Sequence, residues 1–169
     1  MLIICEFAHY SRALAYLFAC TLLFAKISIF ISMETCLFCK IINKEIPAEI
    51  IYEDETAVAI LDIQPRTPGH TMVLPKFHTE NILNLPEEKI EGVFKAVKKV
   101  TDLLDKSLKP DGFTIGINHG KVSGQTIEHL HIHIMPRWFN DNGGSIHSVV
   151  NNPPKQSLAQ IANRIKENL

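Results

Sequence analysis

The stretch Glu128-His129-Leu130-His131-Ile132-His133-Ile134-Met135 decides the fold of this chain. Apolar and non-apolar residues alternate along it, which predicts a β-strand with one buried face. We expect the leucine and the two isoleucines to point into a core and the three histidines to line the opposite face. Residues two apart on a strand are about 6.6 Å apart, so the outer histidines, about 13 Å apart, cannot bind one metal ion together. The spacing therefore indicates divided roles for the three imidazoles, unless a solvent-facing strand carries them by chance.

Length and charge narrow the class of protein. The chain has 169 residues and a formal net charge of −1, and its length fits one domain with a hydrophobic core. Because the chain is not basic, we expect no nucleic-acid partner. Of the four cysteines, two lie in the first twenty residues, which does not favour an extracellular disulfide framework.

Residues 1–32 form a hydrophobic leader that differs in composition from the rest of the chain. Residues 13–31 carry a single charge, Lys26, and are just long enough to cross a bilayer. Three interpretations are open: a leader that precedes a true start at Met33, a membrane anchor, or a secretory signal. We expect a cytoplasmic protein whose folded domain is 33–169, with membrane contact only if the leader is retained, because export would expose its thiols to oxidation.

The rest of the pattern predicts an α+β fold, in which a five-stranded antiparallel sheet carries two main helices on one face and leaves the histidine face open. A continuous apolar stripe predicts a helix over Pro86–Leu108, with the proline in its first turn. A second amphipathic helix is expected over Ser157–Asn168, with Leu158, Ile161, Ala162 and Ile165 facing inward. A short helix at Cys36–Ile42 precedes the expected strands Glu49–Glu53, Thr56–Leu61, His70–Leu74 and Phe113–Asn118, which the histidine strand follows.

Three sequence blocks together resemble one known family. His129–Met135 is similar to the histidine-triad motif, while Pro68–His78 and Gly124–Thr126 resemble the other two blocks of the histidine-triad (HIT) superfamily. From about Cys36 onward, the chain is most similar to the small Hint-like branch of bacteria and archaea. The resemblance implies a hydrolase or transferase that acts on a nucleoside monophosphate joined to an amine, a phosphate or a second nucleotide. It also implies a homodimer whose sheets join into one of ten strands.

The resemblance assigns a catalytic role to three histidines. His131 would be the nucleophile that forms a nucleotidyl-histidine for water to hydrolyse, with its other ring nitrogen held by the carbonyl of His129. His133 and His70 would flank the phosphate, stabilise its charge and assist proton transfer to the leaving group. The alternative for His70 is a purely structural hydrogen bond at the start of its strand.

Substrate contacts are expected on both sides of the histidine row. In the loop before it, the predicted phosphate-binding residues are Asn118, Gln125 and Thr126, which offer amide, hydroxyl and backbone N–H groups. Asp62 matches the acidic residue with which the family binds ribose hydroxyls, although it could equally cap a turn before Pro65. The base pocket implied by the resemblance consists of Phe38, Ile41, Ile60 and Ile63, residues that could also be simply core. We expect a purine nucleotide and no catalytic metal, since the sequence has neither a Walker motif nor a carboxylate cluster for magnesium.

The pair Cys36-x-x-Cys39 has the spacing of half a four-ligand zinc site. In relatives that carry this pair, the other two ligands match His78 and His129. The resemblance therefore implies a closed, structural Zn²⁺ site that holds the first helix against the histidine strand. The alternative is two buried free thiols without a metal.

Three other functions are open to this sequence. A hydrolase of dinucleoside polyphosphates would need room for a second nucleotide, and a nucleotide-binding scaffold would catalyse only incidentally. A metal-dependent, oxygenase-like site on the histidine row is disfavoured, because the sequence shows no carboxylate to complete a two-histidine, one-carboxylate triad.

Overall fold

The computed structural model of the chain describes residues 35–169. The predicted leader, with its anchor and signal-peptide alternatives, lies outside these residues. Within them, the chain up to Arg137 belongs to one compact unit, and Trp138–Leu169 forms a second. Among the helices of residues 35–169, none combines the length and the apolar character needed to span a membrane.

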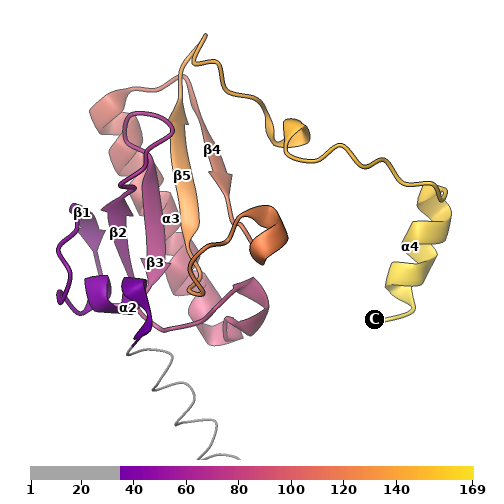
Figure 1. The fold of residues 1–169 in the computed structure, drawn as a ribbon, viewed down its shortest axis with the longest axis horizontal. Coiled ribbons are helices and arrows are strands. Elements are labelled where there is room, and N and C mark those ends of the chain that lie inside the picture. Colours follow the sequence, from indigo (N-terminus) through magenta and orange to yellow (C-terminus); the bar gives the residue numbers. More distant parts are fainter. Residues whose placement is uncertain (1–34) are drawn as a thin grey trace, which may run out of the picture. The chain divides into compact units, whose positions relative to one another are not determined.

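The predicted α+β architecture with a five-stranded antiparallel sheet is confirmed (Figure 1). The strands lie in the order β1-β2-β3-β5-β4, and each pairs with its neighbours in antiparallel fashion. Their bounds are β1 Ile50–Glu53, β2 Ala57–Leu61, β3 Thr71–Pro75, β4 Gly112–Gly116 and β5 Ile132–Arg137. The histidine strand β5 lies between β3 and β4, so both of its edges are hydrogen-bonded and its position is fixed from two sides.

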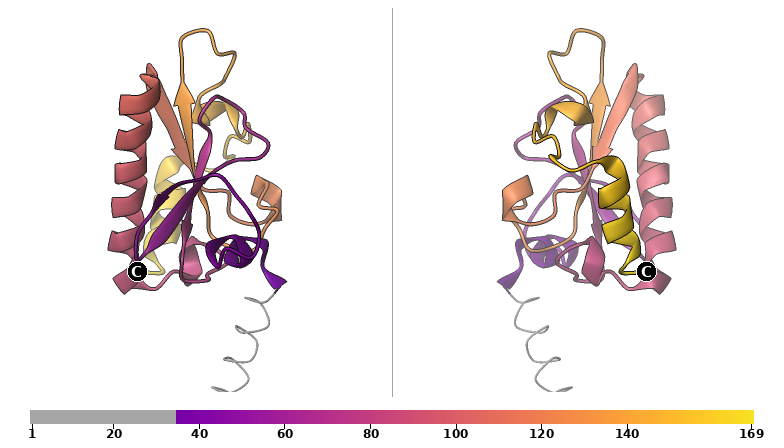
Figure 2. Two further views of the ribbon diagram at one scale, coloured as in Figure 1. Left: turned by 90° about the vertical axis from the view of Figure 1, so that its left-hand side faces the viewer. Right: turned by 90° about the vertical axis from the view of Figure 1, so that its right-hand side faces the viewer.

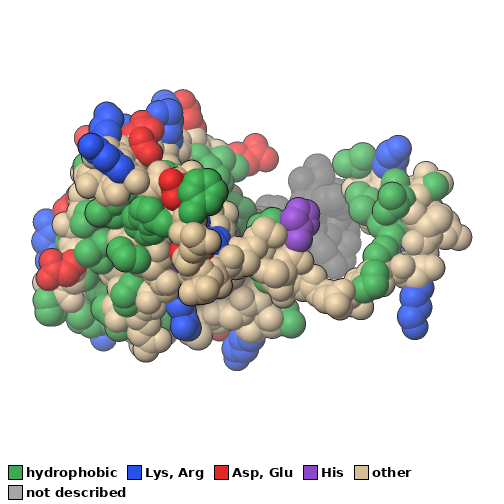
Figure 3. Space-filling model, turned by 90° about the horizontal axis from the view of Figure 1, so that it is seen from above, with side chains coloured by type: hydrophobic (Ala, Val, Ile, Leu, Met, Phe, Trp, Pro, Cys, Tyr) green, Lys and Arg blue, Asp and Glu red, His purple; other side chains and the backbone are tan. Residues whose placement is uncertain are grey.

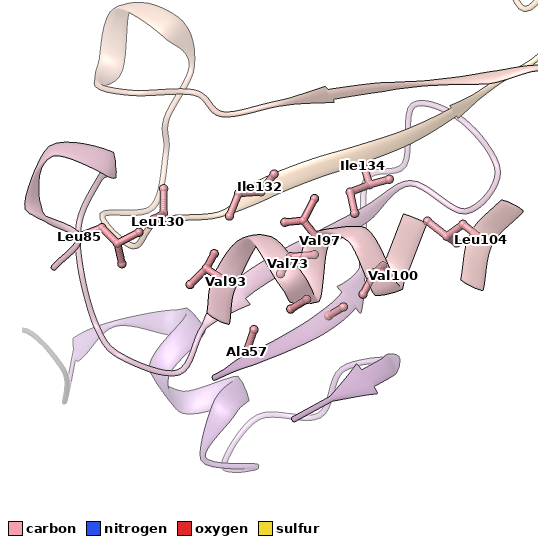
Figure 4. Packing of buried hydrophobic residues seen from close by; sticks show 12 residues of the cluster. Ala57, Val73, Leu85, Val93, Val97, Val100, Leu104, Leu130, Ile132 and Ile134 are labelled. Atoms are coloured by element: carbon pink, nitrogen blue, oxygen red, sulfur yellow. The ribbon is translucent and has the colours of Figure 1, made fainter. Parts of the chain in front are cut away.

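The long helix α3, Glu87–Leu108, packs against one face of the sheet. Half of the predicted apolar stripe is buried, namely Val93, Val97, Val100 and Leu104, together with Ala96. The other members of the stripe are exposed: Ile90, Phe94, Leu103 and Leu108. Ile132 and Ile134 of β5 meet the buried part of the stripe in the main core (Figure 4). Pro86 is the N-cap of the helix and does not lie in its first turn, which corrects the sequence expectation by one position. The core side of the histidine strand thus lies where the alternation predicts.

The short helix α2, Leu37–Ile42, lies on the other side of the sheet from α3 (Figure 2). Its buried residues pack in a second apolar cluster, which consists of Phe38, Ile41, Val58, Ile60, Met72 and Leu74. The prediction of helices on one face only, with an open histidine face, is therefore wrong. The nearly unbroken apolar runs of β2 and β3 are the physical reason, since strands of that composition are buried on both faces.

The regular part of the histidine strand begins later than predicted. Residues 128–131 precede β5, and the N–H of Leu130 donates to the carbonyl of Thr79 at 2.6 Å instead of to a neighbouring strand. Leu130 is nevertheless buried in the main core. The alternation therefore predicts burial correctly even where the ladder of strand hydrogen bonds has not yet begun.

Short 3₁₀ turns connect these elements. Their bounds are η1 Ile82–Asn84, η2 Lys121–Ser123 and η3 Ile146–Ser148.

On the face shown in Figure 3, Lys and Arg side chains lie among Asp and Glu side chains. That view shows a surface of mixed charge, in keeping with the near-zero net charge of the sequence.

The second unit contains helix α4, Leu158–Lys166, whose N-cap Ser157 forms a capping box with Gln160. The helix is present as predicted. The inward orientation of its apolar residues stays a prediction. An amphipathic pattern shows that a helix has an apolar face without specifying what covers that face.

Candidate functional site

The histidines of the row are directed differently, and a single hydrogen bond fixes the tautomer of His131. It lies immediately before β5 and is buried, and its Nδ1 is 2.7 Å from the backbone oxygen of His129. A carbonyl oxygen only accepts hydrogen bonds, so Nδ1 of His131 must carry the proton. In the neutral imidazole, the lone pair is then on Nε2, the nitrogen that can act as a nucleophile.

His133 and His70 form a hydrogen-bonded pair beside His131. Nε2 of His70 is 2.9 Å from Nδ1 of His133, and the ring centroids of His131 and His133 are 5.0 Å apart. The pair joins two elements, because Met72 of β3 is opposite His133 in the strand register and His70 directly precedes that strand. The structure thus brings together the three histidines predicted to be catalytic.

Burial disfavours the charged forms of His133 and His70. Desolvation, together with the charges of His131 and His70, lowers the pKa of His133 from 6.5 to about 4. Desolvation also lowers the pKa of His70, against the opposite influence of the Asp62 carboxylate. Neutral imidazoles have both a lone pair and an N–H, the two features that nucleophilic attack and proton donation require.

The four predicted metal ligands converge in one cluster, which consists of Cys36, Cys39, His78 and His129. Their ligand atoms all lie within 4.8 Å of one another. Nδ1 of His129 is 3.5 Å from Sγ of Cys36, 3.6 Å from Sγ of Cys39 and 3.3 Å from Nδ1 of His78. Tetrahedral Zn²⁺ with the usual bond lengths separates its ligand atoms by about 3.4 to 3.8 Å, so this donor set fits zinc in size and chemistry.

A second contact orients His129 for metal binding. Its Nε2 lies 3.0 Å from the backbone oxygen of Pro75, which accepts the ring N–H and leaves the Nδ1 lone pair facing the two sulfur atoms. Burial lowers the pKa of His129 to about 4, so the ring is neutral as a ligand must be. The carbonyl of Pro75 was not foreseen, because a backbone acceptor leaves no signal in the sequence.

Asp62 follows β2 and makes contacts in two directions. Its Oδ1 accepts the N–H of Gln64 at 2.8 Å, so the turn-capping interpretation is correct for one oxygen. Its Oδ2 is 3.5 Å from Nδ1 of His70. The sequence argument that no carboxylate accompanies the histidines is therefore wrong, because Asp62, His70 and His133 have ligand atoms within 4.8 Å of one another.

Three of the residues predicted for the base pocket lie together, and one does not. Phe38, Ile41 and Ile60 are buried in the second apolar cluster, and the ring centroid of Phe38 is 5.3 Å from that of His131. Ile63 lies on the loop after β2 and is 89% exposed. The aromatic ring thus lies beside that of His131, and a base contact for these four residues stays a prediction.

The loop before the histidines is held by Gln125. Its amide oxygen accepts the N–H of Gly120 at 2.8 Å, and its amide group donates to the carbonyl of Glu80 at 2.6 Å. The backbone N–H of Gln125 donates to the carbonyl of Gly120. A phosphate contact from Gln125 stays a prediction that requires these hydrogen bonds to break, whereas Thr126 is exposed and Asn118 is half-buried.

Comparison with known proteins agrees with this geometry. The HIT domain family model matches residues 43–140. An uncharacterised HIT-like protein of Methanocaldococcus jannaschii is 49% identical over 106 residues, which are 63% of this chain and 81% of that protein. The adenosine 5′-monophosphoramidase of Candida albicans is 30% identical over 142 residues, which cover 82% of this chain and 93% of the relative.

A solved structure agrees as well. The crystal structure of a HIT family protein from Bacillus subtilis is 34% identical, has a TM-score of 0.68, and is matched over 80% of this chain and 97% of its own. With a family model that covers more than half of the sequence, the chain belongs to the histidine-triad (HIT) family.

Proposed function

We propose that this protein hydrolyses or transfers the nucleotidyl group of nucleoside 5′-phosphoramidates or related adenylated compounds by way of a nucleotidyl-histidine at His131. The observation that supports this most directly is the 2.7 Å hydrogen bond from Nδ1 of His131 to the carbonyl of His129, which leaves Nε2 as the nucleophilic atom. The name of the Candida albicans relative supports the phosphoramidate class of substrate.

The first step would form a bond between Nε2 of His131 and the α-phosphorus and break the bond to the leaving group. An amine leaving group must gain a proton as it departs, and we assign this donation to His133, whose ring is adjacent to that of His131. Water would then attack the phosphorus, restore the imidazole and release the nucleoside monophosphate. The attack needs a lone pair on Nε2 of His131, and the donation needs an N–H group on His133.

The cluster of Cys36, Cys39, His78 and His129 would hold a structural Zn²⁺ ion. With four protein ligands, such an ion supplies no open coordination position and acts by holding α2 against the start of the histidine strand. We also propose a purine nucleotide as the substrate, a homodimer as the assembly, the cytoplasm as the location, and residues 33–169 as the functional domain.

The test compares His131→Ala with the unchanged protein in a reaction with adenosine 5′-phosphoramidate. Turnover should fall by at least about 1,000-fold because the covalent route is lost, while the dissociation constant for adenosine monophosphate stays within about threefold. His147→Ala, which removes an exposed histidine of the second unit, is the control and should retain activity.

Samples of the unchanged protein that are quenched in alkaline denaturant, in which the acid-labile phosphorus–nitrogen bond survives, should carry the nucleotidyl group on residue 131, detected by mass spectrometry of peptides. Consumption of substrate without this adduct, or by His131→Ala at the normal rate, would contradict the proposal. Separation of products from a diadenosine polyphosphate tests the alternative hydrolase. Nucleotide binding without turnover of either substrate would favour a scaffold.

A further inference from the structure

The carboxylate of Asp62 is fixed against the edge of the His70 ring. One oxygen is held by the N–H of Gln64, and the backbone N–H of Asp62 donates to the carbonyl of His70 at 2.9 Å, which ties the two ends of the loop together. The other oxygen, Oδ2, therefore stays 3.5 Å from Nδ1 of His70. Both side chains are largely buried, so the interaction between the carboxylate and the ring is stronger than it would be in water.

Nδ1 of His70 has a partner in either protonation state. The backbone N–H of Arg66 approaches it at 3.3 Å and donates to it when the nitrogen has a lone pair. When the nitrogen is protonated, it can donate toward Oδ2 of Asp62 at a similar distance. If the ring only had to be held in one orientation, either the N–H of Arg66 or the carboxylate of Asp62 would be enough. A ring that gains and loses a proton at Nδ1 uses both partners in turn.

The opposite edge of the same ring leads to the nucleophile. Nε2 of His70 is 2.9 Å from Nδ1 of His133, whose ring lies next to that of His131. Asp62, His70 and His133 thus form a continuous chain that ends beside the ring of His131, the proposed nucleophile. The groups that face this pair are the carboxylate of Asp62, the charge of Arg66 and the ring of His131.

We propose that Asp62 is a positioning residue for catalysis, which stabilises a proton on His70 so that the His70–His133 pair can protonate the leaving group. This inference rests on the proposed function. Before the step, His70 has taken up a proton, which the carboxylate of Asp62 favours against the effect of burial, and the resulting imidazolium donates from Nε2 to Nδ1 of neutral His133. As the P–N bond breaks, Nε2–H of His133 passes to the departing amine, and the proton on Nε2 of His70 moves to Nδ1 of His133. His133 stays neutral, His70 becomes neutral with its proton on Nδ1, and the amine takes one proton and the bonding electron pair.

The same three residues could instead hold a metal ion, and their arrangement argues against it. Asp62 approaches Nδ1 of His70, whereas His133 approaches Nε2, so the two neighbours lie at opposite edges of one ring. A single ion can bind only one of those two nitrogens. An ion at Nδ1 of His70 would have His133 across the ring, and an ion at Nε2 would have the carboxylate of Asp62 across the ring. The geometry suits a proton relay better than a chelate.

The experiment uses Asp62→Asn, which keeps the size of the side chain and removes its charge. Two substrates are compared. The alkylamidate of adenosine 5′-phosphate has an alkylamine leaving group, which must be protonated, and the 4-nitrophenyl ester has 4-nitrophenolate, which leaves as an anion. We expect kcat for the alkylamine to fall by at least about tenfold and kcat for 4-nitrophenolate to change less than about twofold. The basic limb of the kcat profile for the alkylamine should shift to lower pH, because the carboxylate that favours the protonated pair is gone.

A second comparison separates this role from a contact with ribose. The measurements are repeated with 2′,3′-dideoxy substrates, which have no hydroxyl groups for Asp62 to bind. The difference between the two leaving groups should persist with these substrates. Asp105→Asn, the same change at an exposed position of α3, is the control and should leave both rates unchanged.

Three results would overturn the inference. An equal loss with both leaving groups that disappears with dideoxy substrates would mean that Asp62 acts only on ribose. A metal ion bound in the unchanged protein and lost in both Asp62→Asn and His133→Asn would replace the relay by a metal site. If the unchanged protein consumes neither substrate, or if His131→Ala retains full activity, the proposed function itself fails and the inference fails with it.

Discussion

Replacing Leu130 by alanine tests whether the alternation of the histidine strand is responsible for the fold. Leu130 is 1% exposed and packs in the main core, between two histidines of the row along the chain. The change removes three carbon atoms from a buried position, which costs about 2.4 kcal/mol in transfer free energy, and the cavity left behind adds about 1 kcal/mol. We therefore expect the free energy of unfolding to fall by about 3 kcal/mol, which corresponds to a melting temperature about 10 °C lower.

The matched control is Leu83→Ala, the same chemical change at a residue of η1 that is 80% exposed. It should lower the free energy of unfolding by less than about 0.5 kcal/mol. Both variants are measured by urea unfolding with the metal content held constant. Equal losses in the two variants would refute the reasoning, since the apolar side of the row would then not be the buried side.

Three further predictions concern the backbone, the pH and the metal. Gly69 has φ +75°, and a Cβ there would overlap with Leu108, so Gly69→Ala should lower the free energy of unfolding by about 1 to 2 kcal/mol in urea, and an unchanged value would contradict this. Burial lowers the pKa of His133 to about 4. Between about pH 6.5 and 4 the unfolded chain therefore binds a proton at this residue that the native protein does not bind, so the free energy of unfolding should fall as the pH decreases through this range. His133→Asn should flatten that slope, and an identical slope in chemical denaturation would count against a buried neutral ring. Burial raises the pKa of Cys39 to about 12, so adding Zn²⁺ to metal-free protein should release a proton from this thiol. In an indicator-dye titration, the Cys39→Ser variant should release one proton fewer on adding Zn²⁺ than the unchanged protein.

The sequence predicts the central part of the fold well because burial leaves a periodic trace. The positions of Leu130, Ile132 and Ile134 follow from alternation alone, and all three are in the main core. The 22-residue helix α3 follows from its apolar stripe for the same reason. Where a pattern reports only that a face is apolar, as in α4, it does not predict which surface covers that face.

The parts of the site that were not predicted depend on closure of loops. Asp62 and His70 are eight positions apart in sequence, and their contact exists because a turn with a backbone hydrogen bond brings the ends of the loop together. Gln125 illustrates the reverse case, since a side chain with suitable donors for phosphate is occupied by the carbonyls of its own surroundings. Residue type indicates what a side chain can bind, whereas the competing partners in the fold decide what it does bind.

The division of labour among the histidines follows from the geometry of one residue. His129 directs Nδ1 toward the cysteine sulfurs, Nε2 toward the carbonyl of Pro75, and its own carbonyl toward Nδ1 of His131. The ring of His129 is thus fixed at both nitrogens, and a fixed ring limits rotation of the backbone that carries the carbonyl. Any group that holds the four predicted metal ligands together therefore also holds the carbonyl of His129, which determines the tautomer of His131. A metal at that cluster would influence His131, the proposed nucleophile, through a single peptide unit, without any contact with substrate.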